Sequence, residues 1–338
     1  MKKCAKCLIP ETHEAISFDE NGVCSVCKNI ENKEVVDWEQ RGKELKEIAE
    51  WSKGQGKYDC IIPASFGKDS AFTLLYACKD LGLNPLVVCC NHGFMRPNVM
   101  ENRRKAQEIL NFDILDFTLD REVVKKLMLE SLKRTGDWCY PCHLLVFALP
   151  MHIANWLNVP MVVWGESSME YTSHFDEAEE VDKKRFDTVV NLGLDLEEIA
   201  KAAGIPMSKL WMMEYPDFKG RSICLGNYIK WDTRDNVRRI KEEIEWTGDQ
   251  VDGIPPEYDY EKVECKFQGM RDYCIYKKKG FGRTAHLVAI DLRNGNIEKE
   301  EAERLIDTYD GIRPSCMDEW LDYVGITEQE YEQIMEGL

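Results

Sequence analysis

The stretch that decides the fold is Tyr58-Asp59-Cys60-Ile61-Ile62-Pro63-Ala64-Ser65-Phe66-Gly67-Lys68-Asp69-Ser70. Its apolar first half predicts a buried strand, and a helical pattern follows from Ala71 to Leu81. A strand, a turn of small residues and a helix N-terminus together present backbone N–H groups and the positive end of a helix dipole to an anion. The stretch therefore predicts a phosphate-binding loop.

The side chains of this loop supply further contacts for phosphate. Lys68 offers a positive charge, and we expect Asp69 to hold Mg²⁺ near the phosphates. The loop is not a Walker A loop, which requires Gly-x-x-x-x-Gly-Lys-Ser/Thr. It resembles the PP-loop of ATP pyrophosphatases, usually Ser-Gly-Gly-x-Asp-Ser, which cleave ATP between its α and β phosphates. The resemblance implies an ATP site made of Ser65, Phe66, Gly67, Lys68, Asp69 and Ser70.

Phe66 departs from that pattern, because the PP-loop family usually has glycine at this position. A backbone position that favours φ above zero is unfavourable for a bulky residue. Two alternatives stay open: either the loop reaches the same shape with a negative φ at Phe66, or the nucleotide site is altered.

Strands and helices alternate through the middle of the chain. The strands are expected at 59–63, 84–90, 112–117 and 160–164, and the helices at 69–81, 96–110, 122–135 and 142–157. This alternation predicts an α/β fold with a doubly wound parallel sheet, whose ligands bind at the carboxyl ends of its strands. Polar residues follow these strand ends, namely Ser65, His92, Asp116, Gly165 and Glu166.

The N-terminus carries two Cys-x-x-Cys knuckles, Cys4-Ala5-Lys6-Cys7 and Cys24-Ser25-Val26-Cys27. A short hairpin between the knuckles can close a tetrahedral site of four thiolates, which is structural rather than catalytic. Zinc is the metal expected from this pattern, and a rubredoxin-like iron site would use the same ligands. Metal binding would supply folding energy to a ribbon with so few apolar residues.

Composition narrows the class of protein. The chain has 338 residues, of which 44% are hydrophobic, and a formal net charge of −17. Such an acidic balance argues against nucleic-acid binding, because nucleic-acid binders display basic faces. The N-terminus has no apolar signal core and no long apolar run follows, so we expect a cytoplasmic protein that does not span a membrane. Fourteen cysteines in such a chain indicate metal ligands, catalytic thiols or buried small residues rather than disulfides.

Motifs along nearly the whole chain carry a family resemblance. They are Lys3–Thr12 with Phe18–Cys24, the PP-loop, Gly136-Asp137-Trp138 before Pro141-Cys142-His143, Trp164-Gly165-Glu166, Glu170-Tyr171, Tyr228–Asp232 and Gly280–Thr284. With them the chain resembles the N-acetyl sugar amidotransferases of the WbpG and PseA type, which act in lipopolysaccharide and pseudaminic acid biosynthesis. The resemblance implies that ATP activates an acetamido oxygen of a sugar or nucleotide sugar, and that ammonia from a separate glutaminase subunit displaces the adenylate to leave an acetamidino group.

The resemblance also implies roles for single residues. Lys68 and Asp69 would carry the phosphate chemistry, and His92 and Gly165 would line the nucleotide pocket. Glu166 or Glu170 would bind Mg²⁺ or act as a base, with surface carboxylates as the alternative. His92 has the alternative of a solvated turn histidine. Arg283 would pair with a phosphate of the sugar nucleotide, unless it belongs to an ordinary surface loop.

A further set of cysteines allows a different chemistry. Cys139-Tyr140-Pro141-Cys142 precedes a predicted helix, and Cys224 follows about eighty residues later. PP-loop tRNA thiolases of the TtcA/TtuA type carry a Cys-x-x-Cys and a distant third cysteine that hold a [4Fe–4S] cluster. By position, Cys139, Cys142 and Cys224 become a candidate cluster site near ATP, with Cys139 and Cys142 as catalytic candidates. Structural or buried thiols are the alternative.

The expected organisation is a zinc ribbon (1–34), a connecting helix (35–56), a PP-loop ATP-binding α/β domain (57–190) and a mostly helical region for substrate or partner (191–338). Three classes of function follow: a sugar amidotransferase, which we favour; a PP-loop sulfurtransferase with a cluster; and a non-catalytic metal-ribbon scaffold whose nucleotide loop has decayed at Phe66. The sequence leaves open which sugar is used and whether the chain forms an oligomer.

Overall fold

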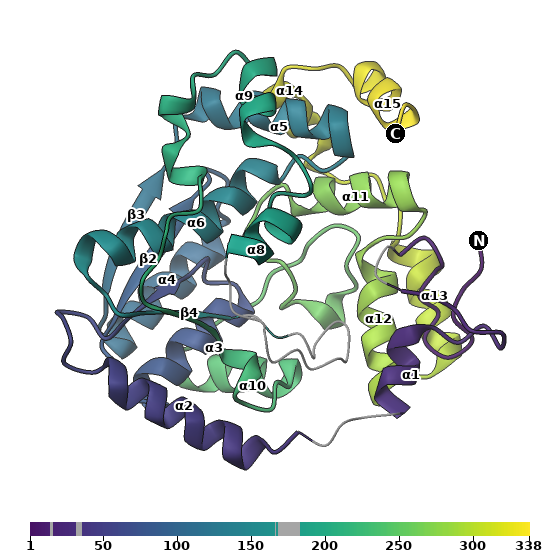
Figure 1. Ribbon diagram of the computed structural model, residues 1–338. Helices are drawn as coiled ribbons and strands as arrows, with labels where there is room; N and C mark the ends of the chain where they lie inside the picture. Colours follow the sequence, from purple (N-terminus) through teal and green to yellow (C-terminus); the bar gives the residue numbers. More distant parts are fainter. Residues whose placement is uncertain (14–15, 32–35, 166, 168–182) are drawn as a thin grey trace.

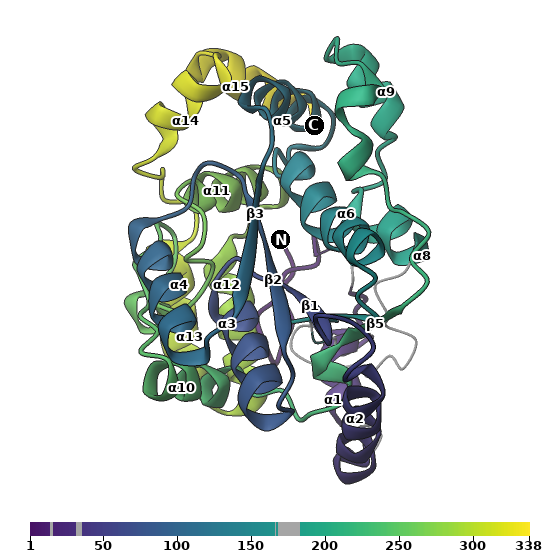
Figure 2. The same ribbon diagram turned by 90° about the vertical axis from the view of Figure 1, so that its left-hand side faces the viewer.

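The centre of the fold is a five-stranded parallel sheet with the strand order β3-β2-β1-β4-β5. The computed structural model describes residues 1–13, 16–31, 36–165, 167 and 183–338. The strands are β1 (Cys60–Pro63), β2 (Pro85–Asn91), β3 (Asp113–Thr118), β4 (Met161–Trp164) and β5 (Arg221–Cys224). The predicted α/β fold class is therefore confirmed, and Figure 2 shows the sheet between its helical layers.

Helices cover both faces of the sheet because neighbouring residues of a strand point to opposite sides. Ile62 belongs to the core formed with α2 (Trp38–Ser52), α3 (Lys68–Leu75), α4 (Pro97–Leu110) and α10 (Thr233–Glu243). The adjacent Ile61 belongs to the core beneath α6 (Tyr140–Leu157). Burial on both faces explains why the inner strands are almost continuously apolar.

Strand β5 was not predicted, and it lies beyond the expected domain boundary at residue 190. It pairs with β4, so that Val163 lies opposite Ile223 and Trp164 opposite Cys224. Helix α10 then packs on α3. The sheet and its covering layer therefore extend into the segment that the sequence assigned to the C-terminal region.

The remainder of the described chain is mostly helical, as expected. The other helices are α1 (Ser25–Glu31), α5 (Arg121–Thr135), α8 (Lys183–Arg185), α9 (Leu196–Ala202), α11 (Gln268–Lys279), α12 (Arg283–Asn294), α13 (Lys299–Tyr309), α14 (Met317–Val324) and α15 (Glu328–Glu336). Single turns are η1 (Tyr76–Asp80), η2 (Phe186–Val190), η3 (Met207–Lys209), η4 (Trp211–Met213), η5 (Leu225–Asn227) and η6 (Pro256–Tyr258). Within the region expected to be mostly helical, residues 207–209 and 211–213 form the two short turns η3 and η4 rather than one helix.

The N-terminal ribbon packs against the C-terminal helices rather than against the sheet (Figure 1). Its four cysteines share one hydrophobic core with Val288 and Ala289 of α12 and with Ala302 and Leu305 of α13. The N-terminal ribbon and helices α12 and α13 thus share a single core.

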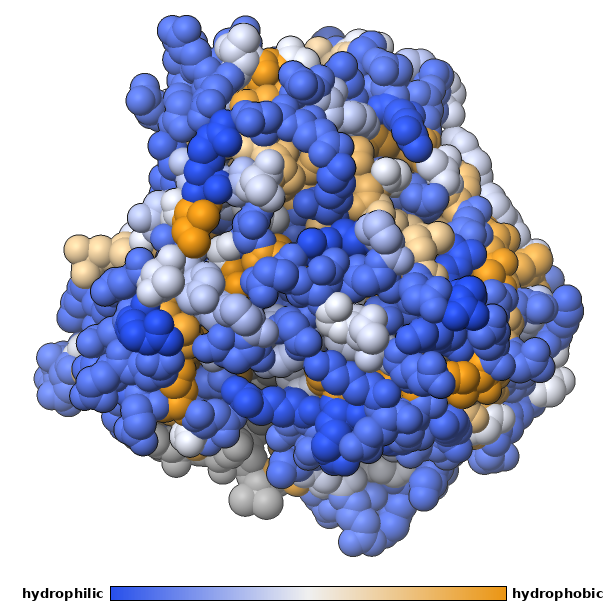
Figure 3. All heavy atoms as spheres, turned by 180° about the vertical axis from the view of Figure 1, so that it is seen from behind, coloured by the Kyte–Doolittle hydropathy of each residue, from blue (hydrophilic) through white to orange (hydrophobic). Residues whose placement is uncertain are grey.

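The described part of the chain contains no helix that is both long enough and apolar enough to cross a membrane. The face shown in Figure 3 is largely hydrophilic, with hydrophobic residues in small separate groups.

Candidate functional site

The phosphate loop follows β1 at the carboxyl edge of the sheet, and Phe66 has a φ of 61° in it. The alternative with a negative φ at this residue is therefore wrong. A left-handed conformation costs a non-glycine residue about 1–2 kcal/mol. Burial opposes that cost, because the Phe66 side chain is fully buried and stacks on Phe112 with ring centroids 6.3 Å apart. Trp246 also donates a hydrogen bond of 3.0 Å from Nε1 to the Phe66 carbonyl.

The loop ends at the N-terminus of α3, where no side chain caps the helix. The amide of Gly67, the residue before α3, points at Ser65 Oγ at 3.4 Å, and Ser70 Oγ lies 3.5 Å from Ser65 Oγ. A Cβ at Gly67 would lie 2.8 Å from Oε2 of Glu264, so the Glu264 side chain would have to move if Gly67 were replaced. Backbone amides, two hydroxyls and a helix dipole therefore converge as an anion site requires.

Lys68 lies at the start of α3 and is only 5% exposed. Its Nζ donates to both carboxylate oxygens of Asp69 at 2.8 Å and lies 3.6 Å from Oε2 of Glu261. Glu261 is 2% exposed, and its other oxygen, Oε1, has no hydrogen-bond partner in the structure. Burial alone would raise the pKa of Glu261, but the positive charges of Lys68, Lys262 and Arg283 outweigh it and lower that pKa. Glu261 is therefore ionised, and sequence reasoning missed it.

Arg283 belongs to the same charged region, since its charge acts on Glu261. It begins α12 and forms a partly buried ion pair of 3.0 Å with Asp272 of α11. Asp272 also has an oxygen, Oδ2, without a hydrogen-bond partner. His286, one turn further along α12, is kept neutral because burial and the Arg283 charge lower its pKa to about 3. The role of Arg283 in substrate binding stays a prediction.

The other residues expected at the nucleotide site have structural contacts of their own. His92 follows β2, and its Nδ1 accepts a hydrogen bond of 3.1 Å from the Phe94 amide. Burial lowers the pKa of His92, so the ring is neutral. A Cβ at Gly165 would lie 2.7 Å from Thr73 Oγ1, so this glycine packs the end of β4 closely against α3. Glu166 and Glu170 lie outside the described residues.

Cys139 and Cys142 meet at the N-terminus of α6, as their spacing predicts. A hydrogen bond from Cys142, together with the nearby charges of Arg271 and His143, lowers the pKa of Cys139. The Cys139 amide donates to Asp137 at 2.8 Å, and Asp137 pairs with Arg271 at 2.9 Å. The loop before α6 is thus fixed by an ion pair to α11.

Cys224 ends β5 and is fully buried in the core beneath α6. It does not join Cys139 and Cys142 in a site for one ion, because in the described part of the chain the ligand atoms that lie within 4.8 Å of one another, in groups of three or more, are those of Cys4, Cys7, Cys24 and Cys27. A [4Fe–4S] cluster holds its thiolates further apart than a single ion does, so the three-cysteine cluster stays a prediction.

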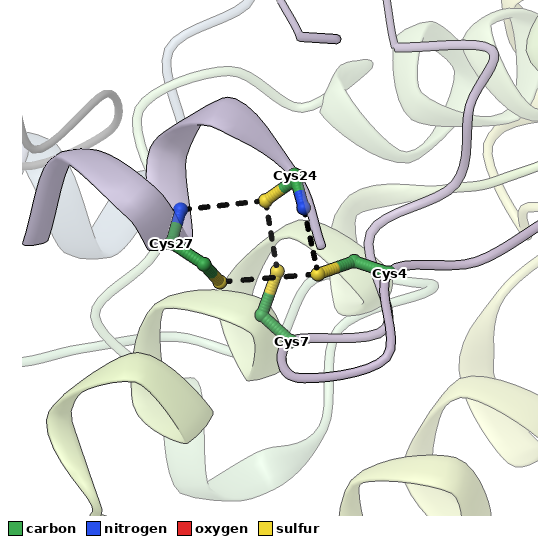
Figure 4. Close-up of side chains that lie close together, drawn as sticks. All are labelled: Cys4, Cys7, Cys24 and Cys27. Atoms are coloured by element: carbon green, nitrogen blue, oxygen red, sulfur yellow. Dashed lines mark hydrogen bonds between the residues drawn. The ribbon is translucent and has the colours of Figure 1, made fainter. Parts of the chain in front are cut away.

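The four N-terminal cysteines form a metal-binding cluster, shown in Figure 4. The Sγ atoms of Cys4 and Cys27 lie 3.9 Å apart, and those of Cys7 and Cys24 lie 3.7 Å apart. A tetrahedral ion with metal–sulfur bonds of about 2.3 Å places its sulfurs about 3.8 Å apart, so the geometry fits one ion. The Cys24 amide points at Cys4 Sγ at 3.3 Å, and Arg293 of α12 lies 3.6 Å from Cys7 Sγ. These donors stabilise thiolates and tie the cluster to the C-terminal helices.

Comparison with known proteins finds a family model that matches the C-terminal part of the chain. The family model for the C-terminal domain of LPS biosynthesis protein WbpG-like matches residues 257–338. An uncharacterised protein of Methanocaldococcus jannaschii, MJ1599, is 27% identical over 165 residues, which is 48% of this chain and 58% of that protein. The match thus spans little more than half of the relative's length.

Two solved structures overlap loosely with the chain. U34-tRNA thiolase NcsA from Methanococcus maripaludis, solved with its [4Fe–4S] cluster, gives a TM-score of 0.37 at 14% identity and covers 94% of this chain and 91% of its own. NMN synthetase from Francisella tularensis gives a TM-score of 0.31 at 13% identity and covers 62% of this chain and 88% of its own. Overlaps this loose support no conclusion about the chain. The family model is more informative: residues 257–338 match the WbpG-like C-terminal domain, which supports the WbpG-type resemblance expected from the sequence.

Proposed function

We propose that the protein is an ATP-dependent, AMP-forming amidotransferase that converts the acetamido group of an N-acetyl sugar into an acetamidino group. One observation carries the proposal. Glu261, within the matched WbpG-like segment, lies 3.6 Å from Lys68 of the phosphate loop. The segment that matches the WbpG-like family model therefore lies against the loop that we propose binds phosphate.

The chemistry explains why a phosphate loop is needed. An amide oxygen is a poor leaving group, and its attack on the α-phosphate of ATP turns it into part of AMP while pyrophosphate departs. Ammonia then adds to the activated carbon, and loss of AMP with a proton leaves the amidine. The enzyme's contribution is to hold the reacting groups in line and to stabilise the charge on the departing groups.

The described residues can perform these tasks. The amides at the start of α3, the hydroxyls of Ser65 and Ser70, and the Lys68 ammonium would bind the pyrophosphate portion of ATP. Asp69 is the ligand expected for Mg²⁺, which would neutralise phosphate charge. Arg283 would pair with the phosphate of a nucleotide carrier on the sugar, if its ion pair with Asp272 opens.

The metal cluster has a structural role in this proposal. Zinc suits a closed site of four thiolates, and such a site stabilises folding rather than catalysis. The WbpG-type resemblance further suggests that ammonia comes from a glutaminase subunit, that the sugar is a precursor of lipopolysaccharide or pseudaminic acid, and that the reaction takes place in the cytoplasm.

The test is a product assay on the purified protein. ATP, Mg²⁺, isotopically labelled ammonium chloride and a panel of nucleotide-linked N-acetyl sugars are incubated together, and AMP and sugar mass are measured. We expect AMP formation that depends on one sugar, and the label in that sugar in place of its acetamido oxygen. AMP formation without label in any sugar would contradict the proposal.

A PP-loop sulfurtransferase is the second candidate, and the pairing of Cys139 with Cys142 beside Arg271 favours it. Replacing ammonium with sulfide in the same assay separates the two functions. Sulfur incorporation, with a brown protein after anaerobic purification, would support the second candidate.

A further inference from the structure

At the phosphate loop, the buried ammonium of Lys68 lies between the partly exposed carboxylate of Asp69 and the buried carboxylate of Glu261. Lys68 Nζ contacts Asp69 at 2.8 Å and Glu261 at 3.6 Å, and Lys68 and Glu261 are 5% and 2% exposed. One ammonium thus contacts two carboxylates, of which that of Glu261 is almost fully buried. A carboxylate buried this deeply is unfavourable unless cations or hydrogen-bond donors satisfy both of its oxygens.

In Glu261, one of the two carboxylate oxygens lacks such a cation or donor. Its Oε2 faces Lys68, whereas its Oε1 has no hydrogen-bond partner in the structure although the residue is almost fully buried. An ionised carboxylate can only accept, so Oε1 requires a metal ion or a hydrogen-bond donor. The backbone at Glu261 is ordered in a turn, because the Glu261 amide donates to the Tyr258 carbonyl at 2.9 Å.

Lys68 would also contact the phosphates when a nucleotide binds. It is the positive side chain of the phosphate loop, and a lysine ammonium binds phosphate as a point charge. When it turns to phosphate, Asp69 and Glu261 lose the cation between them. Mg²⁺ prefers oxygen ligands at about 2.1 Å and is commonly bound by one or two carboxylates plus substrate phosphates.

We propose that Glu261 and Asp69 together hold the divalent cation that accompanies ATP, and that the Lys68 ammonium occupies the place between the two carboxylates until nucleotide arrives. Glu261 therefore makes the WbpG-like segment part of the nucleotide site. The inference rests on the ATP-binding part of the proposed function and is independent of whether ammonia or sulfide is the nucleophile.

Manganese binding tests the proposal without turnover. Mn²⁺ is titrated into the full chain with its N-terminal metal in place, with and without α,β-methylene-ATP, and free Mn²⁺ is followed by electron paramagnetic resonance. Glu261→Gln keeps the shape of the side chain and removes its charge. Glu257→Gln is the matched control, because Glu257 is an exposed carboxylate on the same segment. Circular dichroism and the content of the N-terminal metal verify that each variant is folded.

We expect Glu261→Gln to weaken Mn²⁺ binding in the presence of the analogue by at least about tenfold, a loss that even outer-shell partners of a metal produce. Glu257→Gln should match the wild type. Equal affinity in all three proteins would overturn the role of Glu261.

Lys68→Ala tests the other half of the proposal and leaves Glu261 in place, so it does not depend on the folding of the first variant. Removing the ammonium should strengthen Mn²⁺ binding in the absence of nucleotide, and unchanged binding would refute the place-holding role. Failure of the sugar assay with normal Mn²⁺ results would instead contradict only the proposed reaction.

Discussion

Phe66 offers a direct measurement of backbone strain in the phosphate loop. Its φ of 61° is costly for any side chain, yet the ring is fully buried against Phe112. Truncation to Ala should remove the packing and keep the strain, with a loss of about 3–5 kcal/mol in the free energy of unfolding. Truncation to Gly removes the packing too, but it releases the strain of about 1–2 kcal/mol.

Glycine also carries an entropic cost of about 0.5–1 kcal/mol relative to Ala. The balance of these two costs leaves Phe66→Gly more stable than Phe66→Ala by up to about 1.5 kcal/mol. This order is the reverse of the usual one. Phe112 supplies the control, because it is buried in the same stack at 5% exposure and has an ordinary negative φ. At Phe112 the Gly variant should be less stable than the Ala variant.

The assay is urea unfolding of the four variants, followed by tryptophan fluorescence. If the Ala variant is more stable than the Gly variant at both positions, the φ of Phe66 does not carry this strain. Binding of an ATP analogue to Phe66→Gly gives a second readout, since a loop that keeps its shape should bind the analogue as the wild type does or more tightly.

Four other predictions follow from the described contacts. Cys7→Ser should release the N-terminal metal and destabilise the ribbon with α12 and α13, and an unchanged metal content measured by plasma mass spectrometry would contradict the four-thiolate site. Lys68→Ala should abolish AMP formation while circular dichroism stays native, and normal AMP release would place the nucleotide chemistry elsewhere. Cys139→Ser should cost little ammonia-dependent activity if the thiol only packs, whereas loss of anaerobic brown colour would reveal a cluster. Burial raises the pKa of Asp310 from 3.8 to about 6, so the native state binds this proton more tightly than the unfolded state does. Stability relative to Asp310→Asn should therefore fall as pH rises from about 4 to 6, and a constant difference across that window would disprove the shift.

Four of the five strands could be predicted because each is recognisable from its own short stretch of sequence. The first four strands are apolar runs between turn residues, and each is found close to its expected position. Strand β5 was missed because Arg221 and Ser222 interrupt its apolar character, and only pairing with β4 makes it a strand. Helices α11 and α12 were not located individually within the region expected to be mostly helical. Their boundary is a short turn in which Gly280 follows α11 with a φ of 75° and Arg283 begins α12.

The candidate site was predictable to the extent that its residues are adjacent in sequence. The loop from Ser65 to Ser70 and the four N-terminal cysteines have spacings that already imply their geometry. Glu261 has no such signal, because it is one acidic residue in a polar segment nearly two hundred positions from Lys68. Its importance comes from burial and from an unsatisfied oxygen, which only the folded chain reveals.

The packing of the metal ribbon on α12 and α13 has a consequence for synthesis of the protein on the ribosome. The four cysteines leave the exit tunnel well before the helices that bury them, because α12 and α13 lie far downstream in the sequence. During that interval the ribbon lacks its hydrophobic partner and Arg293, so an ion captured early would be the main restraint on the nascent ribbon. Metal supply during translation should then decide how much of the newly made chain escapes thiol oxidation before the C-terminal helices close over it.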